Sequence, residues 1–309
     1  MQTVVTGGAG FIGSYLVREL VKRGFSVKVI DNLSTGKKKN IEDILGDIEF
    51  IEGDIRDINT LNKHFEKTEV VFHQAALPSV PRSINNPIAS NDHNVNGTLN
   101  VLVAARDKGV KRVIYASSSS AYGNTDVEYK TETLPSNPLS PYALTKFTGE
   151  VYCKLFTKLY GLETVSLRYF NVFGPRQDPN NQYAAAIPLF INLMLKGESP
   201  TVFGNGEQSR DFTYVKNNVE ANIAAALSNK GAGETINIAC GESITLDKLI
   251  SEINANLKTN IKPIYKEPRV GDVKHSKADI KKAESMLGYK PSVYFADGLR
   301  ETIEWYKNQ

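Results

Sequence analysis

A run of glycines near the start of the chain constrains the fold more than any other feature of the sequence. It reads Gly7-Gly8-Ala9-Gly10-Phe11-Ile12-Gly13 and joins a β-branched segment, residues 3–6, to an amphipathic segment, residues 11–23. Glycine tolerates positive φ angles and close backbone contacts. We therefore expect a tight turn from a strand into a helix, and we expect Gly24 to end that helix.

Short β-branched runs alternate with helical patterns through the first half of the chain. This alternation predicts a parallel sheet with helices on both faces, and so an α/β, Rossmann-type doubly wound fold. A later helix and strand are expected to return to the sheet. The strands are expected at 3–6, 26–30, 49–52, 70–73 and 112–116, the later helix at 217–228 and the later strand at 235–238.

The character of the chain changes after Asn171, where Gly-Pro, Asp-Pro and Gly-Asn-Gly turns divide it into shorter elements. We expect a second, smaller α/β lobe that binds the substrate. The predicted Rossmann domain comprises residues 1–168 and 212–238, and the predicted smaller lobe comprises residues 169–211 and 239–309.

Composition excludes several classes of protein. A net charge of +3 over 309 residues is too small to favour nucleic acid or an anionic membrane as partner. Two distant cysteines suit a reducing compartment, and no apolar stretch is long enough to span a bilayer, so a cytoplasmic protein is expected. The four histidines show no metal-ligand spacing, and no metal is predicted.

The position of the glycine run indicates a dinucleotide site. Gly7 permits the turn, Gly10 lets the backbone approach a pyrophosphate, and Gly13 permits close packing of helix on strand. Asp31 ends the second strand, where a carboxylate accepts ribose hydroxyls and repels a 2′-phosphate, so NAD is favoured over NADP. The alternative is a turn that only connects two elements. Asp54 is expected to reach the adenine edge, with a surface loop carboxylate as the alternative.

A phenol and an ammonium group share one helix face in Tyr142-Ala143-Leu144-Thr145-Lys146. Oxidation of a sugar hydroxyl needs a base for its proton and a hydride acceptor, and tyrosine with a pKa of about 10 is a poor base. Lowering that pKa by roughly 3 units takes about 4 kcal/mol. Lys146 and the positive nicotinamide are expected to supply it, with Ser118 at the end of the fifth strand steadying the reacting oxygen.

These motifs, together with Arg168-Tyr169-Phe170-Asn171, resemble the extended short-chain dehydrogenase/reductase superfamily over nearly the whole chain. Within it the sequence most resembles nucleotide-sugar 4-epimerases, which carry a tightly held NAD. The resemblance implies the catalytic residues Ser118, Tyr142 and Lys146. The implied cofactor-binding residues are Gly7, Gly10, Phe11, Ile12, Gly13, Asp31, Asn32, Ser34, Gly36, Asp54, Ile55, Gln74, Ala75, Ala76, Asn94, Ser117, Tyr142, Lys146, Tyr169 and Val172.

The same resemblance implies that a UDP-sugar is the substrate. Arg210 and Arg269 match positions that bind the diphosphate, for which a forked guanidinium is suited. The implied substrate-binding residues are Ser79, Val80, Ser118, Ser119, Tyr142, Asn171, Ala185, Ala186, Val202, Phe203, Arg210, Arg269 and Ser276.

Two positions narrow the expected reaction. Ser119-Ser120 stand where related dehydratases carry an Asp-Glu pair, so dehydration is disfavoured. Ser276 matches a position that is small in epimerases accepting N-acetylhexosamines and a bulky tyrosine in galactose-restricted ones; an ordinary polar loop residue is the alternative. Pro78 departs from UDP-N-acetylglucosamine 4-epimerases, where glycine is familiar, and it fixes the loop.

The expected activity is therefore 4-epimerisation of UDP-N-acetylglucosamine, and also of UDP-glucose, through a transient 4-keto sugar. Two alternatives stay open: a UDP-glucuronate 4-epimerase or decarboxylase, and a non-catalytic NAD-binding scaffold. By analogy with the family we also expect a homodimer formed by the helices near 94–108 and 142–159.

Overall fold

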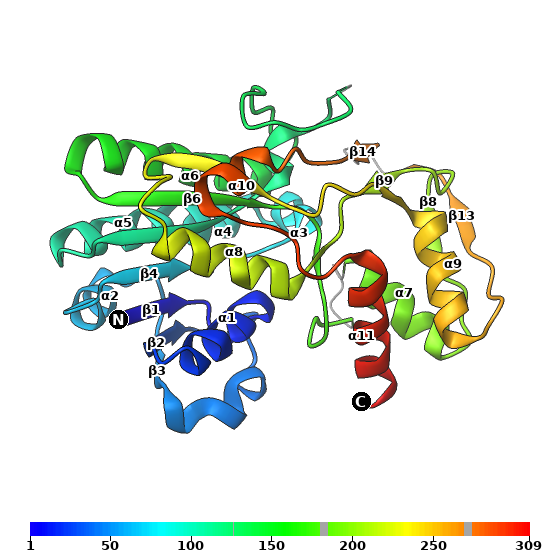
Figure 1. Ribbon diagram of the computed structural model, residues 1–309, viewed down its shortest axis with the longest axis horizontal. Helices are drawn as coiled ribbons and strands as arrows, with labels where there is room; N and C mark the ends of the chain where they lie inside the picture. The colour runs from blue at the N-terminus through cyan, green and yellow to red at the C-terminus, as the bar shows by residue number, and fades with distance from the viewer. Residues whose placement is uncertain (126, 180–184, 269–273) are drawn as a thin grey trace.

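A parallel seven-stranded sheet forms the centre of the molecule in the computed structural model, which describes residues 1–125, 127–179, 185–268 and 274–309 (Figure 1). The strand order is β11-β6-β5-β4-β1-β2-β3. The strands are β1 Gln2–Thr6, β2 Ser26–Asp31, β3 Glu49–Glu52, β4 Val70–His73, β5 Arg112–Ser118, β6 Glu163–Tyr169 and β11 Glu234–Ile238.

Helices cover both faces of this sheet, which confirms the predicted Rossmann-type fold. On one face α1 (Phe11–Lys22) packs against α8 (Val215–Leu227), and α10 (Lys281–Leu287) contacts β11. On the other face α2 (Ile58–His64), α5 (Gly97–Asp107) and α6 (Pro141–Tyr160) pack side by side. A separate buried apolar cluster fills each interface, so the strands are hydrophobic on both sides, as buried parallel strands require.

The predicted strands and helices of this domain are present with small shifts at their ends. The helix after the glycine run ends at Lys22, and Gly24 follows with φ of 78°. β5 continues two residues further than expected, to Ser118. A π-helical turn, η2 (Asp92–Asn96), precedes α5 and was not predicted; such turns are frequent at functional sites.

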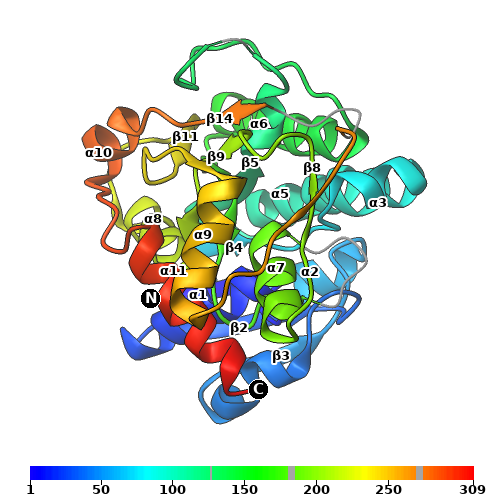
Figure 2. The same cartoon turned by 90° about the vertical axis from the view of Figure 1, so that its right-hand side faces the viewer.

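A second lobe is built around its own apolar cluster and lies to the right of the sheet in Figure 1. Its helices α7 (Ala186–Leu195), α9 (Leu246–Leu257) and α11 (Phe295–Lys307) pack on one another, as Figure 2 shows. Amphipathic α9 and α11 turn their apolar faces inward, as surface helices do. The domain boundaries given above stay a prediction.

Short strands and helices connect the two parts and shape the site. β9 (Ser209–Arg210) pairs with β14 (His275–Ser276) and places Arg210 beside Ser276. The remaining elements are η1 Lys38–Asp47, α3 Val80–Asn85, α4 Pro87–Asn91, η3 Ser119–Tyr122, β7 Val172–Phe173, β8 Thr201–Phe203, β10 Thr213–Tyr214, β12 Ile244–Thr245 and β13 Ile264–Lys266. None of the described helices is long and apolar enough to cross a membrane.

Candidate active site

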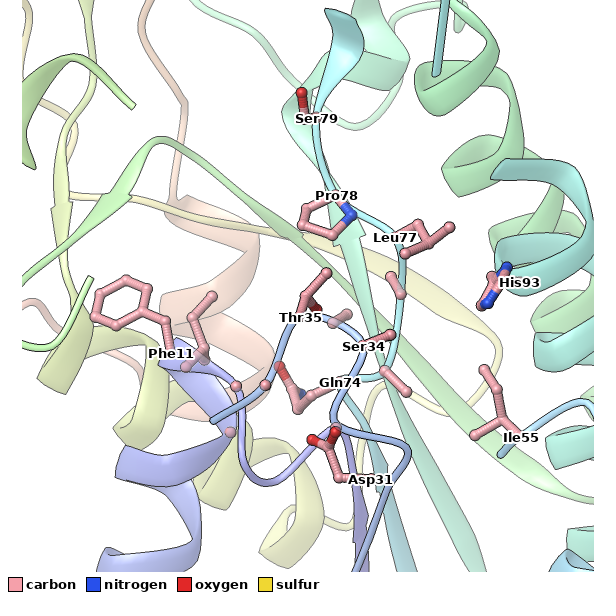
Figure 3. Close-up of a pocket in the computed structure, with 18 of the residues that line it drawn as sticks. Phe11, Asp31, Ser34, Thr35, Ile55, Gln74, Leu77, Pro78, Ser79 and His93 are labelled. Atoms are coloured by element: carbon pink, nitrogen blue, oxygen red, sulfur yellow. The ribbon is translucent and has the colours of Figure 1, made fainter. Parts of the chain in front are cut away.

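A cavity of about 460 Å³ opens at the carboxyl edge of the sheet, beside the point where the strand order switches between β1 and β4 (Figure 3). Ligands bind at such switch points in open α/β sheets. Most of the predicted cofactor residues line this cavity: Gly7, Gly10, Phe11, Ile12, Gly13, Asp31, Asn32, Ser34, Gly36, Ile55, Gln74, Ala75, Ala76, Ser117, Tyr142, Lys146, Tyr169 and Val172.

The glycine turn leaves no room for larger residues. Gly7 has φ of 72°, and a Cβ atom there would lie 2.6 Å from the backbone nitrogen of Ala75. A Cβ atom on Gly13 would lie 2.2 Å from the carbonyl oxygen of Gly7. Gly10 caps α1 without a side chain, so the first N–H groups of this helix face the cavity as an anion-binding terminus. The turn therefore fits a pyrophosphate.

Asp31 organises the ribose end of the cavity. Its carboxylate accepts a hydrogen bond from the backbone N–H of Ala9 at 2.9 Å and another from that of Leu33 at 2.8 Å. Burial raises the pKa of this carboxyl group, and the two backbone donors oppose the rise. One oxygen accepts each bond, so lone pairs remain for ribose hydroxyls, as the sequence argument requires.

A buried polar cluster supports the floor of the cavity. The amide of Gln74 donates to the phenol of Tyr169 at 3.1 Å and to the amide oxygen of Asn222 at 3.0 Å. Asn222, on α8, donates in turn to the Tyr169 phenol at 2.7 Å. Sequence reasoning named Gln74 and Tyr169 but missed Asn222, which lies on the expected helix at 217–228 and which no pattern in the sequence marks.

Two predicted cofactor residues lie off the cavity lining. Asn94, in the π-helical turn η2, exchanges two hydrogen bonds with the backbone of Leu77, at 2.7 and 3.1 Å, and so holds the loop after β4. Asp54 accepts from Asn32 at 2.8 Å and forms an ion pair with Arg56, also at 2.8 Å. Contact of either side chain with the cofactor stays a prediction.

The predicted catalytic groups come together at the end of β5. Tyr142 and Lys146, on the first turns of α6, both line the cavity. The Lys146 amine donates to the carbonyl oxygen of Ala116 at 2.8 Å. Ser118 lies two residues further along the same strand, off the described lining, and its side chain is close enough to the Tyr142 phenol to lower the pKa of that group. A phenol, a hydroxyl and an ammonium group are thus available for proton transfer at one site.

Burial controls the pKa values of these groups in the chain alone. Burial raises the pKa of Tyr142, and the nearby Ser118 side chain only partly opposes this rise. Burial also lowers the pKa of Lys146 to about 8. The reason is that both groups are withdrawn from water, which disfavours each charged form. The sequence argument assigns the lowering of the phenol pKa to Lys146 and the positive nicotinamide together, and it stays a prediction.

A second cavity of about 270 Å³ adjoins the first, because Val172 and Ala185 line both. It is lined by the predicted substrate residues Asn171, Ala185, Ala186, Phe203 and Arg210. The Arg210 guanidinium donates to the carbonyl oxygens of Ser209 at 2.9 Å and Lys274 at 3.3 Å. A nucleotide diphosphate that spans both cavities would contact Arg210 on the wall of the second cavity.

The other predicted substrate residues are placed as follows. Ser79 lines the first cavity, whereas Val80 and Ser119 begin α3 and η3 and lie off the described linings. Val202 is fully buried in the core of the lobe. Ser276 is buried beside Arg210, and Arg269 lies outside the described residues.

Sequence reasoning missed several residues that line the first cavity. Gly53 directly follows β3, and Ala116 ends the strand predicted at 112–116, so their positions at predicted strand ends were a usable signal. Arg82, His93 and Gln177 come from α3, η2 and the loop after β7, where no pattern in the sequence marked them. Among the residues that the structure describes, no three His, Cys, Asp or Glu side chains gather as a metal-ligand set.

Comparison with known proteins decides the family. Residues 3–239 match the model of the NAD dependent epimerase/dehydratase family. The chain belongs to this family. The glycine turn and Asp31 fit a dinucleotide, and NAD is the cofactor that the family uses.

Solved structures and curated proteins agree with this assignment over the whole chain. A UDP-N-acetylglucosamine 4-epimerase from Methanobrevibacter ruminantium, solved with UDP-N-acetylmuramic acid, is 43% identical, with a TM-score of 0.95 over 100% of this chain and 98% of that one. A Thermus thermophilus UDP-glucose 4-epimerase solved with NAD is 35% identical, with a TM-score of 0.91 over 99% of each chain. A UDP-glucose 4-epimerase from Mycolicibacterium smegmatis is 36% identical over 100% of this chain and 99% of its own.

Proposed function

We propose that this family member is a UDP-sugar 4-epimerase that interconverts UDP-N-acetylglucosamine and UDP-N-acetylgalactosamine, and also UDP-glucose and UDP-galactose. One observation carries the proposal: Tyr142 and Lys146 line the dinucleotide cavity, and Ser118 at the end of β5 lies close to Tyr142. The named relatives support the UDP-sugar class, and two of them are UDP-glucose 4-epimerases.

Each residue of the chain has a defined task in this reaction. Tyr142 takes the proton of the sugar 4-hydroxyl, and Ser118 donates a hydrogen bond to the reacting oxygen as its charge develops. NAD, when bound, supplies a reversible hydride acceptor, and its positive ring adds the charge needed to favour phenolate. Lys146, anchored to Ala116, supplies the other positive charge. Tyr142 returns the proton once the 4-keto sugar has presented its opposite face.

Asymmetric binding of the substrate supports the turning step. The second cavity offers Asn171 and Arg210 to the nucleotide diphosphate, and a guanidinium holds phosphate firmly. The hexose would lie near Ser79 and Ser118, which offer hydroxyl groups and no charge. A firm nucleotide contact with a weakly held sugar allows the keto intermediate to rotate without leaving.

The residues that follow Ser118 argue against dehydration. Ser119 and Ser120 form the start of η3, and the Ser120 hydroxyl donates to that of Ser118 at 2.9 Å. Neither can act as the acid or base that removal of water across the ring needs. The small side chain of Ser276, buried beside Arg210, supports room for an N-acetyl group near the sugar.

The proposal is tested by incubating purified protein, without added cofactor, with UDP-glucose, UDP-N-acetylglucosamine and UDP-glucuronate, and following each by NMR. We expect the first two to equilibrate with their 4-epimers. Turnover of UDP-glucuronate alone would favour the uronate alternative. A protein that binds NAD but converts none of the three would be a scaffold, and the proposed function would be wrong.

A further inference from the structure

A carboxylate is buried one helical turn beyond Lys146. Glu150 lies on the same inner face of α6, and its side chain is 4% exposed. It accepts hydrogen bonds from Arg168, at 2.8 Å from Nε and 2.6 Å from the terminal nitrogen, and from the Ser117 hydroxyl. Arg168 is as deeply buried, and its guanidinium carbon lies 4.3 Å from the centroid of the Tyr122 ring. A charge pair in such surroundings persists only with these bonds satisfied.

Lys146 and Glu150 hold two consecutive residues of one strand. Lys146 donates to the carbonyl of Ala116, and Glu150 accepts from Ser117, so the strand is held directly before Ser118, whose side chain lies close to Tyr142. Helix α6 sits directly on β5 at this point: a Cβ atom on Gly149 would lie 2.2 Å from the Tyr115 hydroxyl oxygen. The helix and the strand end are therefore fixed as one unit.

Glu150 also supplies a negative charge one helical turn from the Lys146 ammonium group. The other titratable groups facing the Lys146 amine are Tyr115 of β5, His73 of β4, and Tyr142 and Cys153 of α6. Burial lowers the pKa of His73 to about 3 and raises that of Cys153 to about 12, so both are neutral near pH 7. Burial raises the pKa values of both tyrosines, so these phenols are neutral too unless the positive cofactor favours the Tyr142 phenolate.

We propose that Glu150 is a positioning residue for this reaction: held in place by Arg168, it fixes through its bond to Ser117 the strand end that carries Ser118, and it places its negative charge one helical turn from Lys146. The inference rests on the proposed function for the identity of the reaction, but the effect of Glu150 on Lys146 can be measured without turnover. A purely structural ion pair would stabilise the fold without affecting the protonation of Lys146.

The test compares the NAD-loaded wild type with Glu150→Gln, which keeps the shape of the side chain but removes its charge. We expect the alkaline limb of the pH profile of kcat to move down by about one pH unit, with KM for the UDP-sugar little changed. Because Glu150→Gln leaves the Arg168 cation buried and unpaired, the double variant Glu150→Gln/Arg168→Met is measured beside it. The same direction of shift is expected in this charge-neutral pair.

A matched control and a second readout complete the test. Glu163→Gln breaks the ion pair between Arg112 of β5 and Glu163 of β6. This pair lies at the opposite ends of the strands that carry Ser117 and Arg168, so the variant should leave the pH profile unchanged. NMR titration of the Lys146 amine, assigned with Lys146→Met, follows its protonation without any turnover. If that titration is the same in wild type and in both Glu150 variants, the inference is wrong even if the enzyme is an epimerase. If it shifts while no UDP-sugar is converted, only the proposed function fails.

Discussion

The amine of Lys146 donates a hydrogen bond to the carbonyl oxygen of Ala116 over 2.8 Å, and this contact ties the catalytic helix to the end of β5. The ammonium group is therefore anchored to backbone at the cavity wall. Its charge can act on a phenol and a cofactor in the cavity without a direct ion pair.

The fall of kcat at alkaline pH should reflect the loss of the positive charge of Lys146. Burial lowers its pKa to about 8, so its charge is present below that pH and is lost as the pH rises through it. We expect kcat to fall above about pH 8 as support for the phenolate disappears. Lys146→Arg, whose charge persists at all these pH values, should lose the alkaline fall in whatever activity remains. An unchanged alkaline limb in this variant would show that another group controls it.

Gly13→Ala should abolish retention of NAD. The added methyl group would lie 2.2 Å from the Gly7 carbonyl oxygen, so the turn must open and the helix terminus must leave the pyrophosphate. We expect at least about a tenfold loss of NAD affinity, measured by calorimetry or by NAD content after dialysis. Gly46→Ala is the matched control because nothing lies within 4 Å of its Cβ position. Equal NAD affinity in the two variants would contradict this role for the glycine turn.

Ser79 lines the first cavity with a strained backbone, and the effect of this strain on stability should be separable from the effect of the side chain on turnover. Ser79 has φ of 99°, a conformation that costs a non-glycine residue on the order of 1–3 kcal/mol. Ser79→Gly should therefore raise the free energy of unfolding by about 1 kcal/mol, net of glycine's entropy, while lowering kcat for the UDP-sugar. Lys258→Gly, at φ of 57° at the C-cap that follows α9 in the second lobe, should add stability and leave kcat unchanged. Unchanged turnover in Ser79→Gly would remove Ser79 from the sugar site.

We propose that the outer face of α6 forms the homodimer expected from the family. Leu144, Val151, Leu155 and Leu159 follow one another along that face and are all exposed. Leu155→Glu should convert a dimer to a monomer in analytical ultracentrifugation. Leu227→Glu, on α8, replaces a similarly exposed leucine elsewhere and should not. A monomeric wild-type protein would contradict the proposal at once.

Local patterns in the sequence were enough to predict every strand of the sheet except β6, and also the glycine turn and the shared helix face of Tyr142 and Lys146. Each depends on neighbouring residues: alternation of apolar types, a glycine at a positive φ, or four-residue spacing on a helix. The end of β5 was predicted two residues early, since serines carry little strand preference and only the pairing of Ser118 with Tyr169 extends the ladder.

Contacts between distant segments could not be predicted in this way. Asn222 reaches Tyr169 and Gln74 only because α8 packs under the end of β6, and Asn94 holds Leu77 only because a π-helical turn redirects it. The raised pKa of Tyr142 likewise reflects burial, which spacing along one helix does not reveal.

The most direct measurement of the central claim follows the hydrogen at C4 of the sugar. UDP-N-acetylglucosamine or UDP-glucose deuterated at C4 is incubated with the purified protein in ordinary water, and the product is analysed by NMR. If Tyr142 moves only the hydroxyl proton while the C4 hydrogen passes to the cofactor and back, the 4-epimer retains its deuterium. Replacement of that deuterium by solvent hydrogen, or the absence of any 4-epimer, would contradict the account.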